Sequence, residues 1–316
     1  MKMGKVCFGI DVGGTTVKIG LFTTEAKLID SMEIPTRKED EGRNILPDIC
    51  AAIEAKLVEK QITREDLAGV GIGIPGPITK DGMVLNCVNL GWGMFNVEEK
   101  LSQMLGGITV KAGNDANVAA LGETWQGGGR GFEDLVLVTL GTGVGGGVII
   151  GGKIVSGSNG AAGEIGHIPT VSGEDAETCG CGKKGCLETV GSATGIVREA
   201  KKLLEKSSEA SVLRDMSEIT CKDIFDAAKE GDKLALEVVD KLAYYLGKSI
   251  AGIAAVTNPQ VVVIGGGVSK AGKFLLDKIE ANFLDNAFHA TKNAKFALAT
   301  LGNDAGMYGA AALILN

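Results

Sequence analysis

The sequence predicts an α/β protein built from two related lobes. Its 316 residues exceed the roughly 250–300 residues beyond which a single hydrophobic core usually divides. Apolar runs of strand length alternate with longer runs of helical spacing, which is typical of an α/β protein. A unit of strand, Gly/Thr turn and strand at residues 6–23 recurs at residues 135–150. This repeat is the reason to expect two related lobes.

The first part of the chain contains a predicted hairpin, a helix and two further strands. VCFGIDV (6–12) and VKIGLFT (17–23) are apolar enough for buried strands, and GGTT forms the turn between them. Residues 44–60 show helical spacing. LAGVGIGIPG (67–76) is a strand that enters a Gly/Pro loop, and ITVKAGND (108–115) is a short strand that ends at a polar corner.

The pattern then restarts in the second part. Residues 116–126 form a predicted helix, with Asn114 or Asp115 as its N-cap. LVLVTL (135–140) and VII (148–150) are strands on either side of GTGVGGG. The remaining predicted elements are helices at 192–206, 221–230 and 232–257, a strand, glycine turn and helix start at 261–272, and a small-residue helix at 303–315.

Charge and cysteine content restrict the class of function. The net charge of −7 and the lack of any Lys/Arg-rich run argue against nucleic acid or an anionic membrane as the main partner. The start, MKMGKVCFGIDVGG, does not resemble a signal peptide. Seven cysteines without an export signal predict a cytoplasmic protein with thiols or metal ligands instead of disulfides.

Two uncharged stretches, 135–152 and 249–269, are long enough to be considered as membrane spans. GTGVGGG interrupts the first and TNPQ interrupts the second. We expect a strand–turn–strand and a helix–turn–strand there instead.

Glycine is about twice as frequent as usual, with 48 residues, and three glycine turns follow predicted strands. These are DVGGTT, LGTGVGGG and IGGGVS, and no Walker A pattern occurs. The pattern G-x-G-x-x-G occurs at 71–76, 141–146 and 180–185, but none of these opens a helix after a strand. Phosphate binding is therefore favoured over dinucleotide binding.

The hairpin at residues 11–18 is a candidate phosphate site. Glycines at its turn let backbone N–H groups point at an anion, and the threonine hydroxyls add donors. Asp11 could hold Mg²⁺ directly or through water. An ordinary tight hairpin with a capping aspartate is the alternative, but a second such turn at Gly141-Thr142-Gly143 favours phosphate binding.

Asp115 is the candidate catalytic acid–base residue. It lies at the start of a predicted helix, where the N-terminus stabilises a carboxylate. An ionised aspartate can accept the proton of a hydroxyl that attacks a phosphoryl group. A simple N-cap is the alternative role.

Seven motifs, in their order along the chain, together resemble those of the ROK family of sugar kinases. The similarity is greatest to the Gram-positive-type glucokinases of this family. The motifs are DVGGTTVKIG, IGIPGPI, GNDANVAALGE, TLGTGVGGG, NGAAGEIGH, CGCGKKGCLE and VIGGGVS. The resemblance implies the two-lobed actin/hexokinase-like (ribonuclease H-like) ATPase fold. It places the small N-terminal α/β lobe at 1–115 plus 303–316 and the larger C-terminal lobe, with a zinc-binding loop, at 116–302. Repressors of this family carry a helix-turn-helix ahead of the first hairpin, and only ten residues precede Asp11.

The resemblance also implies residue roles. Asp115 would be the general base on the sugar hydroxyl. The sugar-binding residues would be Asn114, Asp115, Glu164, His167 and Glu188. The residues that bind ATP and its phosphates would be Asp11, Gly13, Gly14, Thr15, Thr16, Lys18, Thr142, Gly143, Gly265, Gly266 and Gly267.

The stretch from His167 to Glu188 is a candidate metal site with the spacing H-x₁₁-C-x-C-x₄-C. This is not a zinc-finger spacing, but three thiolates and one imidazole make a closed tetrahedral set for Zn²⁺. Three unrelated free cysteines are the alternative. The resemblance assigns zinc to His167, Cys179, Cys181 and Cys186. Since four protein ligands leave no position for an activated water, we expect a structural ion near the sugar.

The predicted function is transfer of the ATP γ-phosphate to the 6-hydroxyl of glucose, with ATP, Mg²⁺ and structural Zn²⁺. Another hexose (fructose, mannose, N-acetylglucosamine or N-acetylmannosamine) is the first alternative, and a non-catalytic sugar-responsive binding protein is the second. Polyphosphate as donor is less attractive for an acidic chain. The resemblance implies a homodimer or homotetramer formed through the larger lobe.

Overall fold

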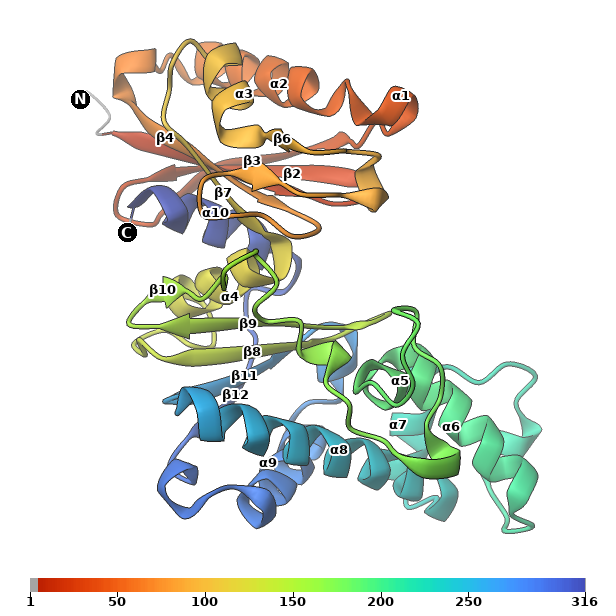
Figure 1. Cartoon of the computed structure of the whole chain (residues 1–316). Coiled ribbons are helices and arrows are strands. Elements are labelled where there is room, and N and C mark those ends of the chain that lie inside the picture. Colours follow the sequence, from red (N-terminus) through yellow and green to blue (C-terminus); the bar gives the residue numbers. More distant parts are fainter. Residues whose placement is uncertain (1–4, 316) are drawn as a thin grey trace. The chain divides into compact units, whose positions relative to one another are not determined.

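The computed structural model describes residues 5–315, which form two compact units (Figure 1). The first unit contains the residues up to Glu133, Gly147–Gly163 and the residues from Leu301 onward. The second contains Asp134–Gly146 and Glu164–Thr300. Residues 1–4, which belong to the expected absence of a leader, and Asn316, the end of the predicted small lobe, lie outside the described residues.

A five-stranded sheet with the order β3-β2-β1-β4-β7 forms the centre of the first unit. Its strands are β1 (Val6–Val12), β2 (Thr16–Thr23), β3 (Leu28–Pro35), β4 (Leu67–Ile74) and β7 (Val110–Asn114). The first three pair antiparallel, and β4 and β7 continue the sheet in parallel. The predicted hairpin is confirmed, and it places Lys18 directly opposite Asp11.

Helices cover both faces of this sheet (Figure 1). They are α1 (Glu39–Gly42), α2 (Ile45–Lys60), α3 (Val97–Met104), α4 (Asp115–Gln126) and α10 (Ala305–Leu315). Phe8 joins the core that α2 closes, whereas Cys7 packs with Met307 of α10. Because successive strand residues face opposite sides, Asp11 lies on the same side as Cys7, which is the α10 side.

Helix α10 lies unusually close to the sheet. A Cβ on Gly9 would lie 2.0 Å from the carbonyl oxygen of Met307, and one on Gly71 would lie 1.7 Å from that of Ala310. Gly309 makes an equally close approach to the backbone of α4. Glycine is therefore required on the strands and on the helix, since any side chain would push the backbones apart.

The second sheet has the order β10-β9-β8-β11-β12. Its strands are β8 (Leu135–Leu140), β9 (Val144–Ile150), β10 (Lys153–Ile154), β11 (Val261–Gly265) and β12 (Lys295–Leu298). β8, β11 and β12 pair in parallel, β10 pairs antiparallel with β9, and β9 begins in the second unit and continues into the first. This order repeats the first sheet strand by strand, which confirms the predicted relation between the two parts.

The helices of the second unit are α5 (Glu188–Gly191), α6 (Ala193–Lys206), α7 (Cys221–Lys229), α8 (Lys233–Thr257) and α9 (Lys273–Asn286). Gly247 lets α8 approach α9 closely, because a Cβ there would lie 2.6 Å from that of Asn282. Within residues 5–315, no helix has both the length and the apolar character needed to cross a membrane. The strand–turn–strand predicted at 135–152 and the helix–turn–strand at 249–269 are both present.

Some elements differ from the sequence prediction. β9 begins at Val144, four residues before the predicted strand, because its three glycines are extended and continue the sheet. Gly147 also lets α4 approach, since a Cβ there would lie 2.6 Å from that of Ala120. β3, α3 and β12 were not predicted, and neither was the small sheet of β5 (Met83–Val84) and β6 (Phe95–Asn96). These are short or half-exposed elements with weak apolar patterning.

Candidate functional site

The first glycine turn joins β1 to β2. Gly13 N–H donates to the carbonyl of Thr16 at 3.0 Å, and the Thr36 hydroxyl donates to the carbonyl of Gly13 at 2.7 Å. Gly14, Thr15 and Thr16 are exposed, and nothing lies within 4 Å of a Cβ placed on Gly14. The two hydrogen bonds of Gly13 fix the base of the turn, while its tip presents backbone and hydroxyl groups to solvent. A phosphate site requires donors that are exposed in this way.

Asp11, near the end of β1, is the one carboxylate of the hairpin at 6–23, and its pKa is shifted. Burial, and then the negative charges of Asp115 and Asp304, raise its pKa from 3.8 to about 6, against the lowering effect of Lys18. A Cβ on Gly306, in the first turn of α10, would lie 2.4 Å from the Asp11 carboxylate. The structure therefore keeps an acid in a half-buried position where its charge is unfavourable, which is common at functional sites.

Lys18 forms ion pairs on the same side of the hairpin. Its Nζ lies 3.0 Å from Asp304 Oδ1 and 3.5 Å from Glu33 Oε1. Asp304 immediately precedes α10, so this pair joins two segments that are far apart in the sequence.

Asn114 and Asp115 stand at the junction of β7 and α4. Asn114 is the N-cap, because its side-chain oxygen accepts the N–H of Asn117 at 3.1 Å. Its amide group donates to the Gly76 carbonyl and to Asp115 Oδ1, both at 3.1 Å. Asp115 is the first helical residue, and the same Oδ1 accepts the N–H of Ala116 at 2.8 Å. Capping is thus done by Asn114, and the Asp115 carboxylate is oriented at the positive end of α4.

The second glycine turn, between β8 and β9, rests on the start of α6. Gly141 N–H donates to the Gly143 carbonyl at 2.9 Å, which closes the turn. Ala193 N–H donates to the Gly141 carbonyl at 2.8 Å, and the hydroxyl of Thr194 lies 3.4 Å from the Thr142 carbonyl. The backbone of this turn is therefore fixed by its own bonds and by the helix beneath it.

Glu188, the first residue of α5, connects this turn to the cysteine-rich loop. Its Oε2 accepts the N–H of Val144 at 3.1 Å, and its Oε1 lies 3.5 Å from the Cys179 sulfur. A Cβ on Gly143 would lie only 2.4 Å from Oε2. Glycine at this position leaves room for the carboxylate, which is a second reason for it besides turn formation.

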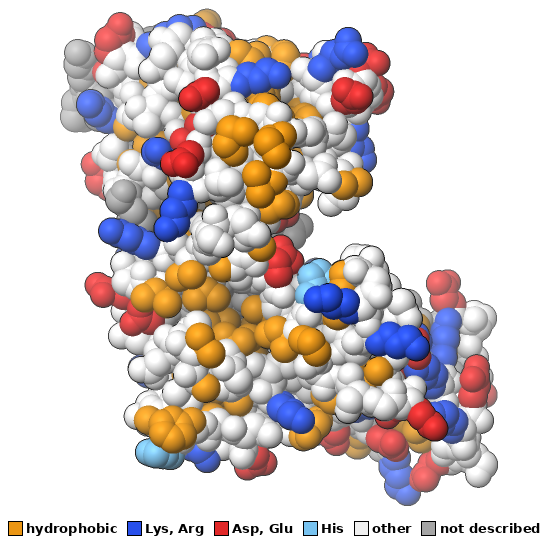
Figure 2. Space-filling view, viewed as in Figure 1, with side chains coloured by type: hydrophobic (Ala, Val, Ile, Leu, Met, Phe, Trp, Pro, Cys, Tyr) orange, Lys and Arg blue, Asp and Glu red, His pale blue; other side chains and the backbone are white. Residues whose placement is uncertain are grey.

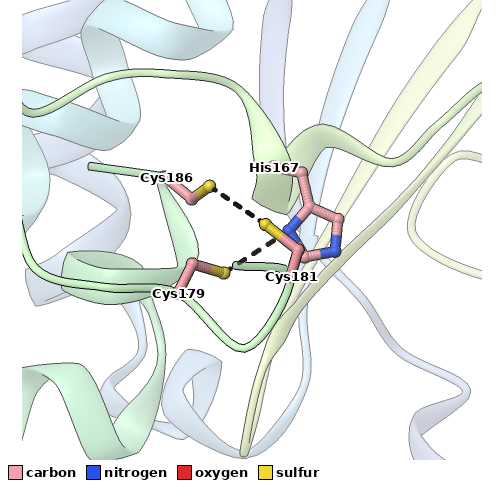
Figure 3. A group of neighbouring side chains, drawn as sticks. All are labelled: His167, Cys179, Cys181 and Cys186. Carbon is pink, nitrogen blue, oxygen red and sulfur yellow. Dashed lines mark hydrogen bonds between the residues drawn. The ribbon is translucent and has the colours of Figure 1, made fainter. Parts of the chain in front are cut away.

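The candidate metal residues lie together in the second unit (Figure 3). One ligand atom from each of His167, Cys179, Cys181 and Cys186 lies within 4.8 Å of all the others. His167 Nδ1 is 3.6 Å from the Cys179 sulfur, and the sulfurs of Cys181 and Cys186 are also 3.6 Å apart. Metal–sulfur bonds of about 2.3 Å in a tetrahedral site need separations close to these. The four residues therefore fit a tetrahedral Zn²⁺ ion.

The loop that carries the cysteines closes at a glycine, and its thiols differ in pKa. Gly185 has a φ of +74°, and a Cβ there would lie 1.9 Å from the Val171 carbonyl, so the loop needs glycine to close. Burial raises the pKa of Cys186 to about 12, whereas a bond from the Lys183 N–H lowers the pKa of Cys181. Metal binding at Cys186 therefore has to overcome the cost of ionising a buried thiol.

The second nitrogen of His167 points away from the sulfurs. His167 Nδ1 faces Cys179, and Nε2 lies 4.0 Å from the Glu164 carboxylate. One ring nitrogen is therefore directed to the cluster and the other to Glu164, an arrangement in which one imidazole can contact both a metal and a substrate.

A cavity of about 470 Å³ lies beside the second turn, within the second unit. Thr142 and Gly267, both expected to contact ATP, line it. Gly265 and Gly266, also expected near ATP, have a packing role as well: a Cβ on Gly265 would lie 3.0 Å from that of Ala299, and one on Gly266 would lie 2.4 Å from the Leu140 carbonyl. The other lining residues, which sequence reasoning missed, include Cys221, Lys222, Phe225, Lys229 and Lys270. No local sequence signal identifies them, because the fold alone brings α7 to the turn.

The repeated sheet order and the two strand–glycine turn–strand hairpins define a protein of the two-lobed actin/hexokinase-like ATPase fold. The model of the ROK family matches residues 7–316, and the chain belongs to this family. It is 47% identical to a glucokinase of Halalkalibacterium halodurans, over 97% of this chain and 94% of that protein.

Two solved structures are also similar. A ROK family glucokinase from Streptomyces griseus, in complex with glucose and AMPPNP, is 36% identical with a TM-score of 0.74 and 98% of both chains covered. A ROK hexokinase from Thermus thermophilus is 29% identical with a TM-score of 0.79, over 98% of this chain and 97% of that one.

Replacing Asp11 with asparagine should stabilise the fold at neutral pH. The rise of its pKa from 3.8 to about 6 corresponds to about 3 kcal/mol. The stability that protonated Asp11 contributes is fully present below the unfolded-state pKa and is lost as the pH rises through about 6. In urea unfolding, Asp11→Asn should raise the free energy of unfolding by up to about 3 kcal/mol at about pH 7.5, and by much less at about pH 4.

Asp81→Asn is the matched control, since Asp81 is exposed. It should change the free energy of unfolding by no more than about 0.5 kcal/mol at either pH. A lower stability of Asp11→Asn at neutral pH would contradict the inferred cost of the buried charge.

Proposed function

We propose that this chain is an ATP-dependent glucokinase that transfers the γ-phosphoryl group of ATP to the 6-hydroxyl of glucose. The observation that carries the proposal is the Asp115 carboxylate, held in one orientation at the N-terminus of α4 by Asn114 and Ala116. The relative from Halalkalibacterium halodurans is a glucokinase, and the structure from Streptomyces griseus contains glucose and a nucleotide analogue. A hexokinase activity that uses ATP follows from these relatives, and glucose is the acceptor we favour.

In the proposed reaction, Asp115 accepts the proton of the 6-hydroxyl. The sugar oxygen then forms a bond to the γ-phosphorus while the bond from that phosphorus to the bridging oxygen of ADP breaks. The N–H of Ala116 and the positive end of the α4 dipole both stabilise the carboxylate of Asp115. Orientation of the acceptor matters most here, because the protein has little covalent chemistry to perform in phosphoryl transfer.

The phosphates are assigned to the two glycine turns. The exposed tip at Gly14–Thr16 and the turn at Gly141–Gly143 offer backbone N–H and hydroxyl donors. Asp11 would hold the Mg²⁺ that accompanies ATP, directly or through water. The cavity beside Thr142 and Gly267 has the size of a small-molecule site and supports an adenosine position.

On the second unit, Glu164, His167 and Glu188 are assigned to the sugar hydroxyls. Carboxylates accept from hydroxyl groups, and the imidazole can donate or accept. The cluster of His167 with three cysteines would hold a structural Zn²⁺, which supplies a fixed crosslink between the loop and His167. The protein's own part is then to keep His167 and Glu188 in place, since both contact Cys179.

One face of α8 is a candidate surface for contact between two copies of the chain. Four residues along α8, Tyr244, Lys248, Gly252 and Val256, recur every four positions and so share one face. Val256 is 87% exposed, and three of the four line a surface groove of about 520 Å³. We assign this face to a second copy of the chain in a homodimer.

The functional lobes are assigned to 1–115 with 303–316 and to 116–302, so that Asp115 is the last residue of the first segment.

The surface charge supports ATP over polyphosphate as the donor. On the face shown in Figure 2, lysine and arginine side chains are interspersed with acidic ones and form no continuous basic track. A long polyanion needs such a track.

The decisive experiment is sugar-dependent ADP release from Mg-ATP with glucose, mannose, fructose, N-acetylglucosamine and N-acetylmannosamine side by side. We expect glucose to give the highest kcat/KM. A preference for another sugar would keep the mechanism and change the substrate. If zinc-replete protein releases no ADP with any of these sugars, the catalytic proposal is wrong and a sugar-responsive binding protein becomes the favoured function.

Replacing Asp115 with alanine should lower kcat by about 10²–10⁴-fold, the usual contribution of a general base. Thermal unfolding and Mg-ATP binding should stay close to wild type, since Asn114 still caps α4. Steady-state kinetics of Asp115→Ala beside the exposed control Asp81→Ala would test this. A kcat within about tenfold of wild type would refute the general-base role.

Replacing Cys181 with alanine should abolish stoichiometric zinc, measured by elemental analysis of the purified protein, and raise KM for glucose. Cys50→Ala is the matched control, because Cys50 is a free cysteine outside the cluster. It should keep a full zinc content. A full zinc complement in Cys181→Ala would disprove the site.

A further inference from the structure

The side of the first sheet that faces α10 carries a group of charged side chains that the proposed mechanism only partly uses. Asp11 and Lys18 are direct cross-strand partners, so both point to this side. Asp304 meets Lys18 there from the segment that precedes α10. We call Asp11, Lys18 and Asp304 the acid–lysine cluster.

Negative charge exceeds positive charge at this cluster. Against the effect of burial, the carboxylates of Asp304 and Glu33 raise the pKa of Lys18. The positive charge of Lys18 in turn lowers the pKa of Asp11. The negative charge of Asp115 raises the pKa of Asp11. Such an excess is suited to a metal–phosphate complex, provided that Lys18 does not neutralise Asp11 first.

Lys18 is well placed to neutralise the charge of Asp11. Directly opposite residues of antiparallel strands have their Cβ atoms about 4.5–5.5 Å apart, and a lysine side chain can easily span that distance. In the structure, however, its Nζ is directed to Asp304, at 3.0 Å. The Lys18 side chain is only 22% exposed, so few alternative positions are open to it.

Asp304 is itself held in a defined place. Its N–H donates to the Leu301 carbonyl at 3.1 Å, and the first turn of α10 follows directly. That turn contacts the Asp11 carboxylate at Gly306, where no side chain would fit. The position of Asp304 relative to Asp11 and Lys18 is therefore set by the close packing of α10 on the sheet.

We propose that Asp304 is a positioning residue that holds Lys18 away from Asp11, so that the Asp11 carboxylate stays available to Mg-ATP. This inference rests on the proposed function, in which Asp11 serves the nucleotide. Two carboxylates lie directly opposite Lys18 on its neighbouring strands, those of Asp11 and Glu33. Without Asp304, Lys18 turns to Asp11, the more buried of the two, and forms an ion pair with it. That pair competes with the metal–phosphate complex, while the sugar side of the reaction is unaffected.

A double-mutant cycle on the full chain tests this, with Asp304→Asn, Lys18→Met and the combination. The measurements are the Kd for Mg-ATP by calorimetry, and kcat with KM for each substrate. Asp304→Asn should raise the Kd and KM for Mg-ATP about tenfold and leave the KM for glucose within about twofold. Lys18→Met should weaken Mg-ATP binding less than Asp304→Asn does, and the double variant should match Lys18→Met.

Glu33→Gln is the matched control. Glu33 is the second partner of Lys18, but it lies farther away, at 3.5 Å, and is more exposed. Its replacement should change the Kd for Mg-ATP by less than about twofold. If Asp304→Asn lowers the thermal midpoint, Asp304→Ser takes its place, since this side chain is half exposed.

A double variant as impaired as Asp304→Asn alone would overturn the proposal, because Asp304 would then act without Lys18. A Lys18→Met variant as impaired as Asp304→Asn would also overturn it, since Lys18 would then bind phosphate itself. If wild type binds Mg-ATP but phosphorylates no sugar, the proposed function fails, while the calorimetric cycle still decides the role of Asp304. If wild type binds no Mg-ATP, both proposals fall.

Discussion

The backbone-to-backbone approach of α10 to the first sheet is the constraint on which the candidate site depends. Glycines at positions 9 and 71 on the strands admit the carbonyl groups of the helix directly. The same helix meets the backbone of α4 through Gly309. One short helix therefore sets the position of Asp11 and Asp304 and also supports the helix that begins with Asp115. A displacement of α10 by the width of one methyl group would disturb all three acids together.

Both units hold polar side chains in fixed positions, but they do so through different interactions. In the first, backbone contacts hold acidic side chains in a place where their charge is unfavourable. In the second, a loop rich in glycine and cysteine gathers three sulfurs and an imidazole, and Glu188 ties this cluster to the turn at Gly143. In both cases the functional groups are fixed by what surrounds them and have little freedom of their own. This rigidity is what a reaction that depends on positioning requires.

The sequence predicted much of this arrangement because its signals are local. The hairpin of β1 and β2, the N-cap at the start of α4 and the cysteine spacing are each readable from a few adjacent residues. The lining of the nucleotide-sized cavity was not predictable, since Phe225 and Lys229 look like any amphipathic helix until the fold brings α7 beside Thr142. The partner of Lys18 was hidden for the same reason, because Asp304 lies 286 positions away. The glycines at 265 and 266 show the reverse case, in which a motif assigned to a ligand also has a packing role.

The central strand β1 and the helix α10 that completes its core lie at opposite ends of the described chain. During synthesis, β1 leaves the ribosome long before α10 exists. At about 5–20 residues per second this interval lasts on the order of tens of seconds. Through that time the face of the sheet that packs against α10, with Cys7 and Phe22, has no cover. A nascent chain with such a face is a natural client for a chaperone that binds exposed apolar strands.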